Sequence, residues 1–227
     1  MHLRIVLLLA AVAACSGRPA QTASSAPKPR SDSISKKGDN DRESGSRGVP
    51  SGHLGRTEDL RSSIEDVTYH IRGNRWAITT GPAHIMYSPR DTMTGEFIVA
   101  SSFDQKETEH PGSFGLFVGG SELDLPTRRY TYFVVRSNGD YSVQVREGSE
   151  TRDIIPWTVP KVLGNPVSER RVRHRLAIRV HADSVRFLYN GAPIAAVKAG
   201  TVPTEGIAGL RLDRNIRVTV DHLRASS

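Results

Sequence analysis

The sequence has very little cysteine, with a single residue of this type among 227. A small secreted domain held by disulfides needs cysteines in pairs, so disulfides within the chain are excluded. Hydrophobic residues make up only 37% of the chain. That share is low for a chain that packs throughout, and it predicts that part of the chain is a solvated segment. The length fits one ordinary domain with additional segments, or two small domains.

Motifs for metal and phosphate sites are also missing. The sequence holds neither a His-Glu-x-x-His motif nor a close pair of histidines. His174 and His181 are seven residues apart on an expected strand, so their side chains would point to opposite faces. No glycine-rich loop follows a strand and opens a helix, and Gly115 to Gly120 therefore indicates close sheet packing. We predict no metal ligands and no cofactor from these motifs.

The N-terminus carries an apolar run, Ile5 to Ala14, which is too short to span a bilayer. It ends in small residues followed by Cys15, the only cysteine. This run resembles the bacterial lipobox, in which the cysteine is lipidated and becomes the first residue of the mature protein. The resemblance implies export and anchoring to the bacterial envelope, and Ser16 after the cysteine implies the outer membrane. An ordinary signal peptide with a chance cysteine is the alternative.

The chain is basic, with a formal net charge of +7. Such a balance is typical of proteins that bind nucleic acid, an anionic membrane surface or an anionic glycan. Export argues against nucleic acid, so we expect a glycan or envelope polysaccharide as the partner, and the membrane itself through the lipid anchor.

Composition divides the chain into three parts. Residues 1–15 are the expected signal peptide, 16–60 a disordered linker and 61–227 a folded domain. From Gly17 to about Arg56 nearly all residues are small, polar or charged. Such a segment cannot bury enough surface to offset its ordering entropy, so Met1 to about Arg56 should contribute nothing to the fold. Leu60, Ile64 and Val67 recur at helical spacing and predict one or two helical turns.

After Arg75 the hydrophobic pattern has period two, with turn residues every eight to twelve positions. Asn138-Gly139 and Asn190-Gly191 are preferred centres of type I′ hairpins, and Ala182-Asp183 marks a third turn. About ten short strands without disulfides predict an all-β, two-sheet antiparallel sandwich. The expected strands are Gly95–Phe103, Ser113–Val118, Tyr130–Arg136, Tyr141–Arg146, His174–Val180, Ser184–Tyr189, Ile194–Val197, Ile207–Leu212 and Ile216–Leu223.

Three elements together carry a family resemblance. They are Phe114-Gly-Leu-Phe-Val-Gly-Gly120, the Tyr130–Gly139 segment that ends in Asn-Gly, and the strand pair from His174 to Gly191. Their order, followed by Gly206-Ile-Ala-Gly-Leu210, resembles the concanavalin A-like lectin/glucanase jelly rolls. It is most similar to the bacterial 3-keto-disaccharide hydrolase-type domains, over roughly Trp76 to Leu223. The resemblance implies a jelly roll, and these structural motifs support the fold more than a function.

The glucanases of this fold carry catalytic carboxylates at alternating positions of one strand, and a retaining glycosidase needs two about 5 Å apart. Glu122 and Asp124 are the similar pair here, and they would share a strand face. The alternative is a solvated loop, because a third carboxylate is missing and Pro126 would end the strand. A structural calcium ion, common in such sandwiches, is the one possible metal, with Asp104, Glu122, Asp124 and Asp213 as candidate ligands.

A sugar site needs aromatic rings for stacking and polar groups for hydroxyls. A two-residue loop at Asn138-Gly139 would pair Phe133 with Gln144 and place both on a mixed face with Arg146. Tyr132, Val134, Val143 and Val145 would then point into the core. Trp157 lies among prolines in an expected loop that could rim the groove, or it caps the core. The run from Arg170 to Arg175 is either a solvated strand edge or a contact for anionic glycans.

The sequence thus predicts a surface lipoprotein that displays a carbohydrate-binding jelly roll. The alternatives are a glycoside-active enzyme of the 3-keto-disaccharide hydrolase type, as the resemblance implies, and a non-catalytic protein-interaction module. An enzyme would line the groove with a compact cluster of carboxylates or a His. A binding module would show aromatic rings and Arg there, and an interaction module would expose a contiguous apolar patch.

Replacing Cys15 by Ser should release the protein from the membrane fraction. The acyl chains expected on this cysteine would each contribute roughly 0.8 kcal/mol per buried methylene, and a serine cannot carry them. Membrane fractionation of parent and variant is the measurement. A variant that stays in the membrane fraction like the parent contradicts the anchor.

Overall fold

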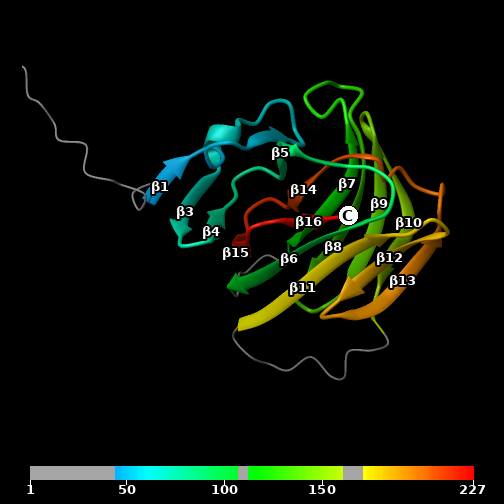
Figure 1. Ribbon diagram of the computed structural model, residues 1–227. Coiled ribbons are helices and arrows are strands. Elements are labelled where there is room, and N and C mark those ends of the chain that lie inside the picture. The colour runs from blue at the N-terminus through cyan, green and yellow to red at the C-terminus, as the bar shows by residue number, and fades with distance from the viewer. Residues whose placement is uncertain (1–43, 107–111, 161–170) are drawn as a thin grey trace, which may run out of the picture. The chain divides into compact units, whose positions relative to one another are not determined.

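The computed structural model describes residues 44–106, 112–160 and 171–227 (Figure 1). The lipobox cysteine Cys15 and the first part of the expected linker lie outside these residues. Among the described residues no helix is long and apolar enough to cross a membrane.

The described chain is built of antiparallel strands in two sheets, which confirms the predicted all-β sandwich (Figure 1). The nine-stranded sheet contains, in spatial order, β1 (Ser44–Arg47), β3 (Thr68–Arg72), β4 (Arg75–Thr79), β15 (Arg217–Asp221), β6 (Phe97–Lys106), β11 (Arg171–Val180), β12 (Ser184–Tyr189) and β13 (Ala192–Lys198), with β16 (Arg224–Ser226) also paired to β6. The seven-stranded sheet contains β10 (Glu150–Thr158), β9 (Tyr141–Glu147), β8 (Arg129–Arg136), β7 (Ser113–Ser121), β14 (Gly206–Leu212), β5 (His84–Met93) and β2 (Leu54–Thr57).

The main core lies between the two sheets, where alternate side chains of both interdigitate. Aromatic rings meet across it: Phe133 of β8 lies 5.5 Å from Phe187 of β12, and Phe103 of β6 lies 5.2 Å from Phe114 of β7, measured between ring centroids. Both pairs are fully buried. The apolar side chains of the period-two pattern in the sequence therefore form the core that holds the two sheets together.

The two Asn-Gly turns differ. At Asn190-Gly191 both residues have positive φ and Tyr189 pairs with Ala192, which confirms a two-residue type I′ hairpin. At Asn138 the prediction is wrong, because only Gly139 has positive φ and the backbone N–H of Arg136 donates to Asp140 O at 2.8 Å. The loop therefore holds three residues.

The side chain of Asn138 supplies a physical reason for the longer loop. Its Oδ1 accepts a hydrogen bond from the backbone N–H of Asp140 at 3.1 Å, and its Nδ2 donates to the Asp140 carboxylate at 2.9 Å. This local turn bends the chain with Asn138 at negative φ, which leaves the left-handed position to Gly139.

The longer loop shifts the pairing of β8 with β9 by one residue, and a one-residue shift exchanges the two faces of a strand. Phe133 pairs with Val143 and points into the core, whereas Tyr132 pairs with Gln144. The predicted assignment of Phe133 to the mixed face and of Tyr132 to the core is thus reversed. Val134, Val143 and Val145 are all buried, but only the last two lie in the core between the sheets.

The folded part begins earlier than the predicted boundary at residue 60. β1 pairs with β3, β2 pairs with β5, and Val49 packs against the core. Residues 44–56 therefore contribute to the fold, contrary to the composition argument, because backbone pairing holds segments such as Leu-Gly-Arg-Thr that are poor in apolar residues. The predicted helical turns shrink to a single 3₁₀ turn, Ile64–Asp66, which the Ser63 hydroxyl caps by accepting from Glu65 N at 3.2 Å.

Two histidines are completely buried. His84 is 0% exposed and His174 1%, and burial lowers the pKa of each to about 4. The Nδ1 of His174 lies 2.7 Å from the Tyr189 hydroxyl, while its Nε2 has no partner among the described residues. Both rings are therefore neutral in the fold at neutral pH.

These histidines should make the domain less stable in acid. Between pH 6.5 and 4 the unfolded chain binds protons that the folded chain excludes, so stability is full above pH 6.5 and is lost as pH falls. Each ring should cost about 2 kcal/mol between pH 7 and pH 5. His174→Gln should lose correspondingly less over that interval in urea denaturation. His70→Gln, at an exposed position of β3, is the control; equal behaviour of the two variants contradicts the assignment.

Candidate functional site

The seven-stranded sheet has a second packed surface on the side that points away from the nine-stranded sheet, here called the outer face. Tyr130, Tyr132 and Val134 of β8 lie on it, with Gln144 and Arg146 of β9 opposite them. Its apolar members form a cluster separate from the main core: Ile85, Tyr87, Phe117, Leu123, Tyr130, Tyr132 and Val134. The outer face is therefore not a plain solvated surface.

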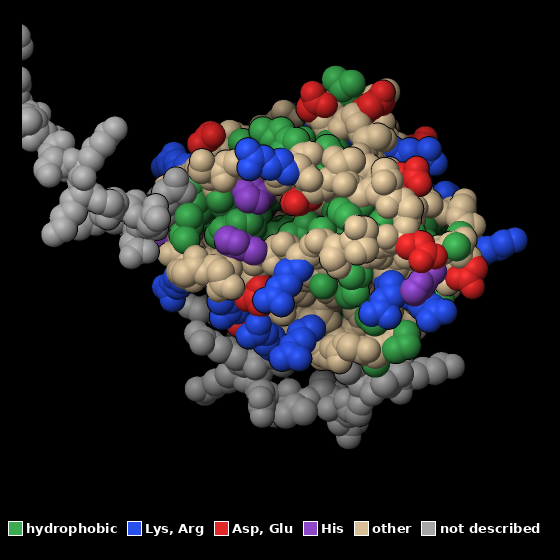
Figure 2. Space-filling view, in the orientation of Figure 1, with side chains coloured by type: hydrophobic (Ala, Val, Ile, Leu, Met, Phe, Trp, Pro, Cys, Tyr) green, Lys and Arg blue, Asp and Glu red, His purple; other side chains and the backbone are tan. Residues whose placement is uncertain are grey.

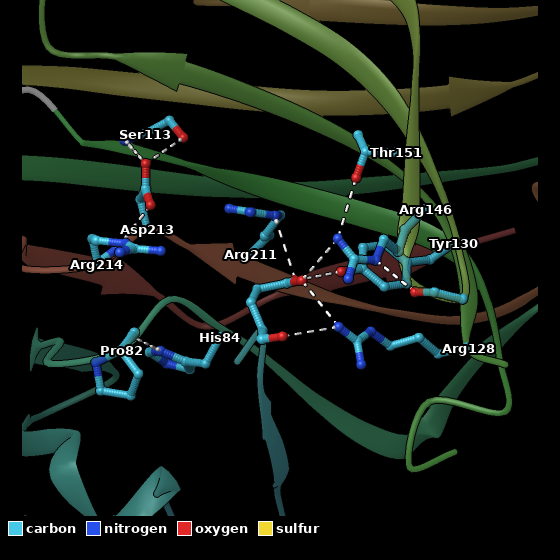
Figure 3. Close-up of polar contacts among 12 residues, drawn as sticks. Pro82, His84, Ser113, Arg128, Tyr130, Arg146, Thr151, Arg211, Asp213 and Arg214 are labelled. Atoms are coloured by element: carbon cyan, nitrogen blue, oxygen red, sulfur yellow. Dashed lines mark hydrogen bonds and ion pairs between the residues drawn. The ribbon is translucent and has the colours of Figure 1, made fainter. Parts of the chain in front are cut away.

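Glu58, directly after β2, is the centre of an ion network on this face. Its carboxylate accepts hydrogen bonds from the Tyr130 hydroxyl at 2.6 Å and from Arg128 Nη2 at 3.1 Å. Arg146 Nη1 lies 3.4 Å and Arg211 Nε 3.8 Å from the carboxylate oxygens. Arg128, Tyr130, Arg146 and Arg211 converge from three strands and a loop, as Figure 3 shows.

The charges of this network support one another. Burial alone would raise the pKa of the Glu58 carboxyl, but Arg211, the Tyr130 hydroxyl, Arg146 and Arg128 outweigh burial and hold that pKa below its ordinary value. Burial alone would lower the pKa of Arg211, but Glu58 together with Tyr132, Tyr130 and Asp213 outweighs burial and holds that pKa above its ordinary value. Burial raises the pKa of Tyr130, which stays protonated as a donor. The Glu58 carboxylate is thus ionised and the Arg211 guanidinium is charged.

Close strand packing lets Arg211 reach the network. Arg211 of β14 pairs with Gly115 of β7, and a Cβ at Gly115 would lie 2.0 Å from Phe133 O. No side chain therefore stands between β14 and β8, and the Arg211 guanidinium lies 4.8 Å from the centre of the Tyr132 ring. This confirms the packing role predicted for the glycine run.

The β9–β10 end of the outer face is more open. Trp157 on β10 is 37% exposed, and the Arg136 guanidinium lies 3.8 Å from its ring centre. Gln144 on β9 donates to the Asp153 carboxylate on β10. A ring, an amide, a carboxylate and a guanidinium thus occupy three adjacent strands, which is the set of groups that can stack on and hydrogen-bond to a sugar.

The predicted ligand-binding residues are only partly brought together. Gln144, Arg146 and Trp157 share the outer face, although Trp157 lies on a strand rather than in a loop. Phe133 is fully buried in the main core, where its ring cannot stack on a ligand. Sequence reasoning missed Glu58, because it belongs to a polar segment interpreted as linker and no motif marks it.

The predicted catalytic pair does not share a strand face. Glu122 and Asp124 are both exposed in the turn that follows β7, where Glu122 has φ of 51° and its carbonyl accepts from Leu125 N at 2.8 Å. The solvated-loop alternative is therefore correct.

Within the described ranges, no three His, Cys, Asp or Glu side chains come together to hold a metal ion. Two of the expected calcium ligands have other partners, since Asp104 pairs with Arg75 and Asp213 accepts from Ser113 N at 3.3 Å. The four carboxylates considered for calcium thus do not form one site.

The predicted basic run lies on the other sheet. Arg173 and Arg175 of β11 are exposed on the far side of the nine-stranded sheet, and His174 between them points into the core. Arg170 lies outside the described residues. This surface is a second candidate, independent of the outer face.

No protein-family model matches the sequence, and neither does any curated protein. Solved structures do match. The carbohydrate-binding module CBM66 from Bacillus subtilis is 11% identical, with 76% of this chain and 95% of that chain covered and a TM-score of 0.55. A GH16 protein from Bacteroides ovatus, in complex with a G4G4G3G product, is 7% identical, with 79% and 97% covered and a TM-score of 0.57.

A third similar structure is a Bacillus subtilis protein of unknown function with a galectin-like fold. It is 15% identical, with 80% of this chain and 97% of that chain covered and a TM-score of 0.51. At such identities the likeness is one of fold. The predicted concanavalin A-like jelly roll is confirmed, while the finer resemblance to 3-keto-disaccharide hydrolase-type domains stays a prediction.

Replacing Glu58 by Gln should destabilise the domain by about 3 kcal/mol, because Arg128, Arg146 and Arg211 would remain desolvated without a counter-charge. Guanidinium denaturation measures the change. Glu147→Gln is the matched control: Glu147 pairs with Arg129 at 3.2 Å, but their side chains are 46% and 52% exposed, so it should cost about 0.5 kcal/mol or less. Equal costs would mean that the Glu58 network contributes nothing beyond a surface pair.

Proposed function

We propose that this domain binds carbohydrate at the β9–β10 end of the outer face. The observation that carries the proposal is the group of Trp157, Arg136, Gln144 and Asp153 on three neighbouring strands, of which Trp157 and Asp153 are exposed and the other two half-buried. A sugar ring presents an apolar face that an indole ring can stack on, and hydroxyls that amide, guanidinium and carboxylate groups can bind.

The Glu58 network adjoins this site on the same face through Arg146 of β9. Arg146 donates to Gly148 O at 2.8 Å and to the Thr151 hydroxyl at 3.2 Å, and its Nη1 also reaches Glu58. These contacts hold the β9–β10 hairpin in one arrangement. A binding surface whose side chains are already held loses less entropy when a ligand arrives.

Two of the similar structures favour a sugar ligand as a class, since one is described as a carbohydrate-binding module and the other as holding an oligosaccharide product. These two structures do not distinguish sugar binding from glycoside hydrolysis. That choice comes from the side chains on this face.

Binding is favoured over glycoside hydrolysis by the state of the carboxylates. The two-carboxylate mechanism needs a general acid of raised pKa beside a second carboxyl group. On the outer face Glu58 has a lowered pKa and is closed in by Tyr130 and three arginines. Glu122 and Asp124 lie in an exposed turn. A glycoside-active enzyme of the 3-keto-disaccharide hydrolase type is the second candidate, resting on the family resemblance alone.

A protein-interaction module has less support. The exposed large apolar side chains of the described chain are Leu54, Leu60 and Leu125, and the neighbouring pair Trp157 and Val159 at the end of β10. Such scattered residues are ordinary on a monomeric surface.

We also propose that the domain is displayed from the bacterial envelope, on the outer membrane, through a lipid on Cys15. The motif Ala13-Ala14-Cys15 and the polar segment that follows support this placement. An anchored domain with a sugar-binding face would hold the envelope against a polysaccharide.

Combined replacement of Trp157 and Gln144 by Ala should lower glycan affinity by about tenfold or more, since a stacked ring and a hydrogen bond each contribute on the order of 1 kcal/mol. A glycan array identifies the ligand, and titration of parent and variant measures the loss. Leu60→Ala, at a 75% exposed position outside β8, β9 and β10, is the control and should bind like the parent. An array that stays blank for neutral and acidic glycans alike would contradict the binding function.

A further inference from the structure

The far side of the nine-stranded sheet carries a groove of about 550 Å³, on the opposite sheet from the outer face. That volume is in the range of ligand sites. Its floor is a row of apolar side chains across the strands, with Ala100 of β6 opposite Ala177 of β11 and Leu188 of β12 next to it. The groove therefore arises because the short side chains of Ala100 and Ala177 leave a hollow between the longer side chains around them.

Arginines line this floor on three sides. Arg175 and Arg179 lie two residues before and after Ala177, so they share its face about 13 Å apart. Arg224 of β16 stands beside Ala100 at the third side. Figure 2 shows Lys and Arg side chains gathered over the part of the surface where β6 and β11 run.

The carboxylates at this groove are already engaged. Asp221 accepts from Arg75 Nε at 2.8 Å and from Arg173 Nη2 at 2.6 Å, and Asp104 pairs with Arg75. Within the described part of the chain, Arg175, Arg179 and Arg224 have no carboxylate partner. Three guanidinium groups thus face the groove uncompensated.

One cross-strand pair adds to the positive charge. Arg179 of β11 lies directly opposite Arg186 of β12, and both are exposed. Like charges directly opposite each other destabilise a sheet. Edge protection does not account for them, because β11 and β12 are interior strands of this sheet. An anionic ligand would relieve the repulsion.

We propose that this groove binds a segment of acidic polysaccharide, with carboxylate or sulfate groups held by Arg175, Arg179 and Arg224. Guanidinium groups bind such anions with paired hydrogen bonds. The apolar floor of Ala100, Ala177 and Leu188 accepts the C–H face of a sugar ring. A flat lipid surface would meet the arginines but could not reach this floor. The site is independent of the proposed function, because it lies on the other sheet and uses other residues.

The test compares binding of the full chain to dextran sulfate, to polygalacturonate and to neutral dextran. The variant R175Q/R179Q/R224Q should bind the two acidic polymers about tenfold or more weakly, since it loses all three guanidinium contacts to their anionic groups. Binding by the parent should fall as salt rises. Neutral dextran should not bind to this groove.

A matched variant separates a built groove from general basicity. R47Q/R72Q/R90Q removes the same three charges at exposed positions of β1, β3 and β5, away from the groove. It should keep the parent's affinity within about twofold, and equal melting temperatures establish that both variants fold. An equal loss in the two variants overturns the proposal in favour of non-specific attraction.

Two further outcomes would also overturn it. Equal loss of neutral dextran binding and of dextran sulfate binding in R175Q/R179Q/R224Q would mean that the arginines do not select the ligand. Phosphatidylglycerol vesicles that lose binding with R175Q/R179Q/R224Q, while dextran sulfate does not, would identify a lipid surface instead. Loss of glycan binding in the variant that lacks Trp157 and Gln144 on the outer face does not change any of these outcomes for the groove.

Discussion

The packing of the outer face of the seven-stranded sheet depends on the ion network at Glu58. Arg128, Arg146 and Arg211 contribute side chains that are at most 17% exposed. Removing such charges from water costs several kcal/mol each unless a counter-charge and hydrogen bonds replace the water. The Glu58 carboxylate supplies that counter-charge, and the Tyr130 hydroxyl donates a further hydrogen bond to it. Strand β2 delivers it, because its pairing with β5 places Glu58 over the neighbouring strands.

This network also explains why the N-terminal strands belong to the domain. Glu58 N donates to Ala83 O at 2.8 Å, and the Thr57 hydroxyl donates to Asp59 O at 2.9 Å and to Ser62 O at 3.1 Å. These bonds hold the short segment after β2 in place and aim the carboxylate inward. This segment has few apolar side chains, and hydrogen bonds therefore hold it against the sheet more than the burial of apolar surface does.

The two sheets turn different chemistry toward the solvent. The outer face of the seven-stranded sheet combines rings with paired charges, and most of its guanidinium groups already have a partner. The far side of the nine-stranded sheet carries arginines without carboxylates around an alanine floor. A shared jelly-roll fold thus leaves function to the side chains that each face presents. The fold alone, common to binding modules and hydrolases, does not distinguish them.

The pattern of residues was sufficient for the nine expected strands, the two-sheet sandwich and the hairpin at Asn190-Gly191, because these depend on local alternation and on backbone angles that few residues adopt. It did not predict strands β5 and β10. It was insufficient at Asn138-Gly139, where a side-chain bond to Asp140 lengthened the loop and exchanged Phe133 for Tyr132 on the outer face. The pattern also did not predict the ion network at Glu58. Residues 70 to 153 positions apart meet there, and only the pairing of distant strands determines which charges become neighbours.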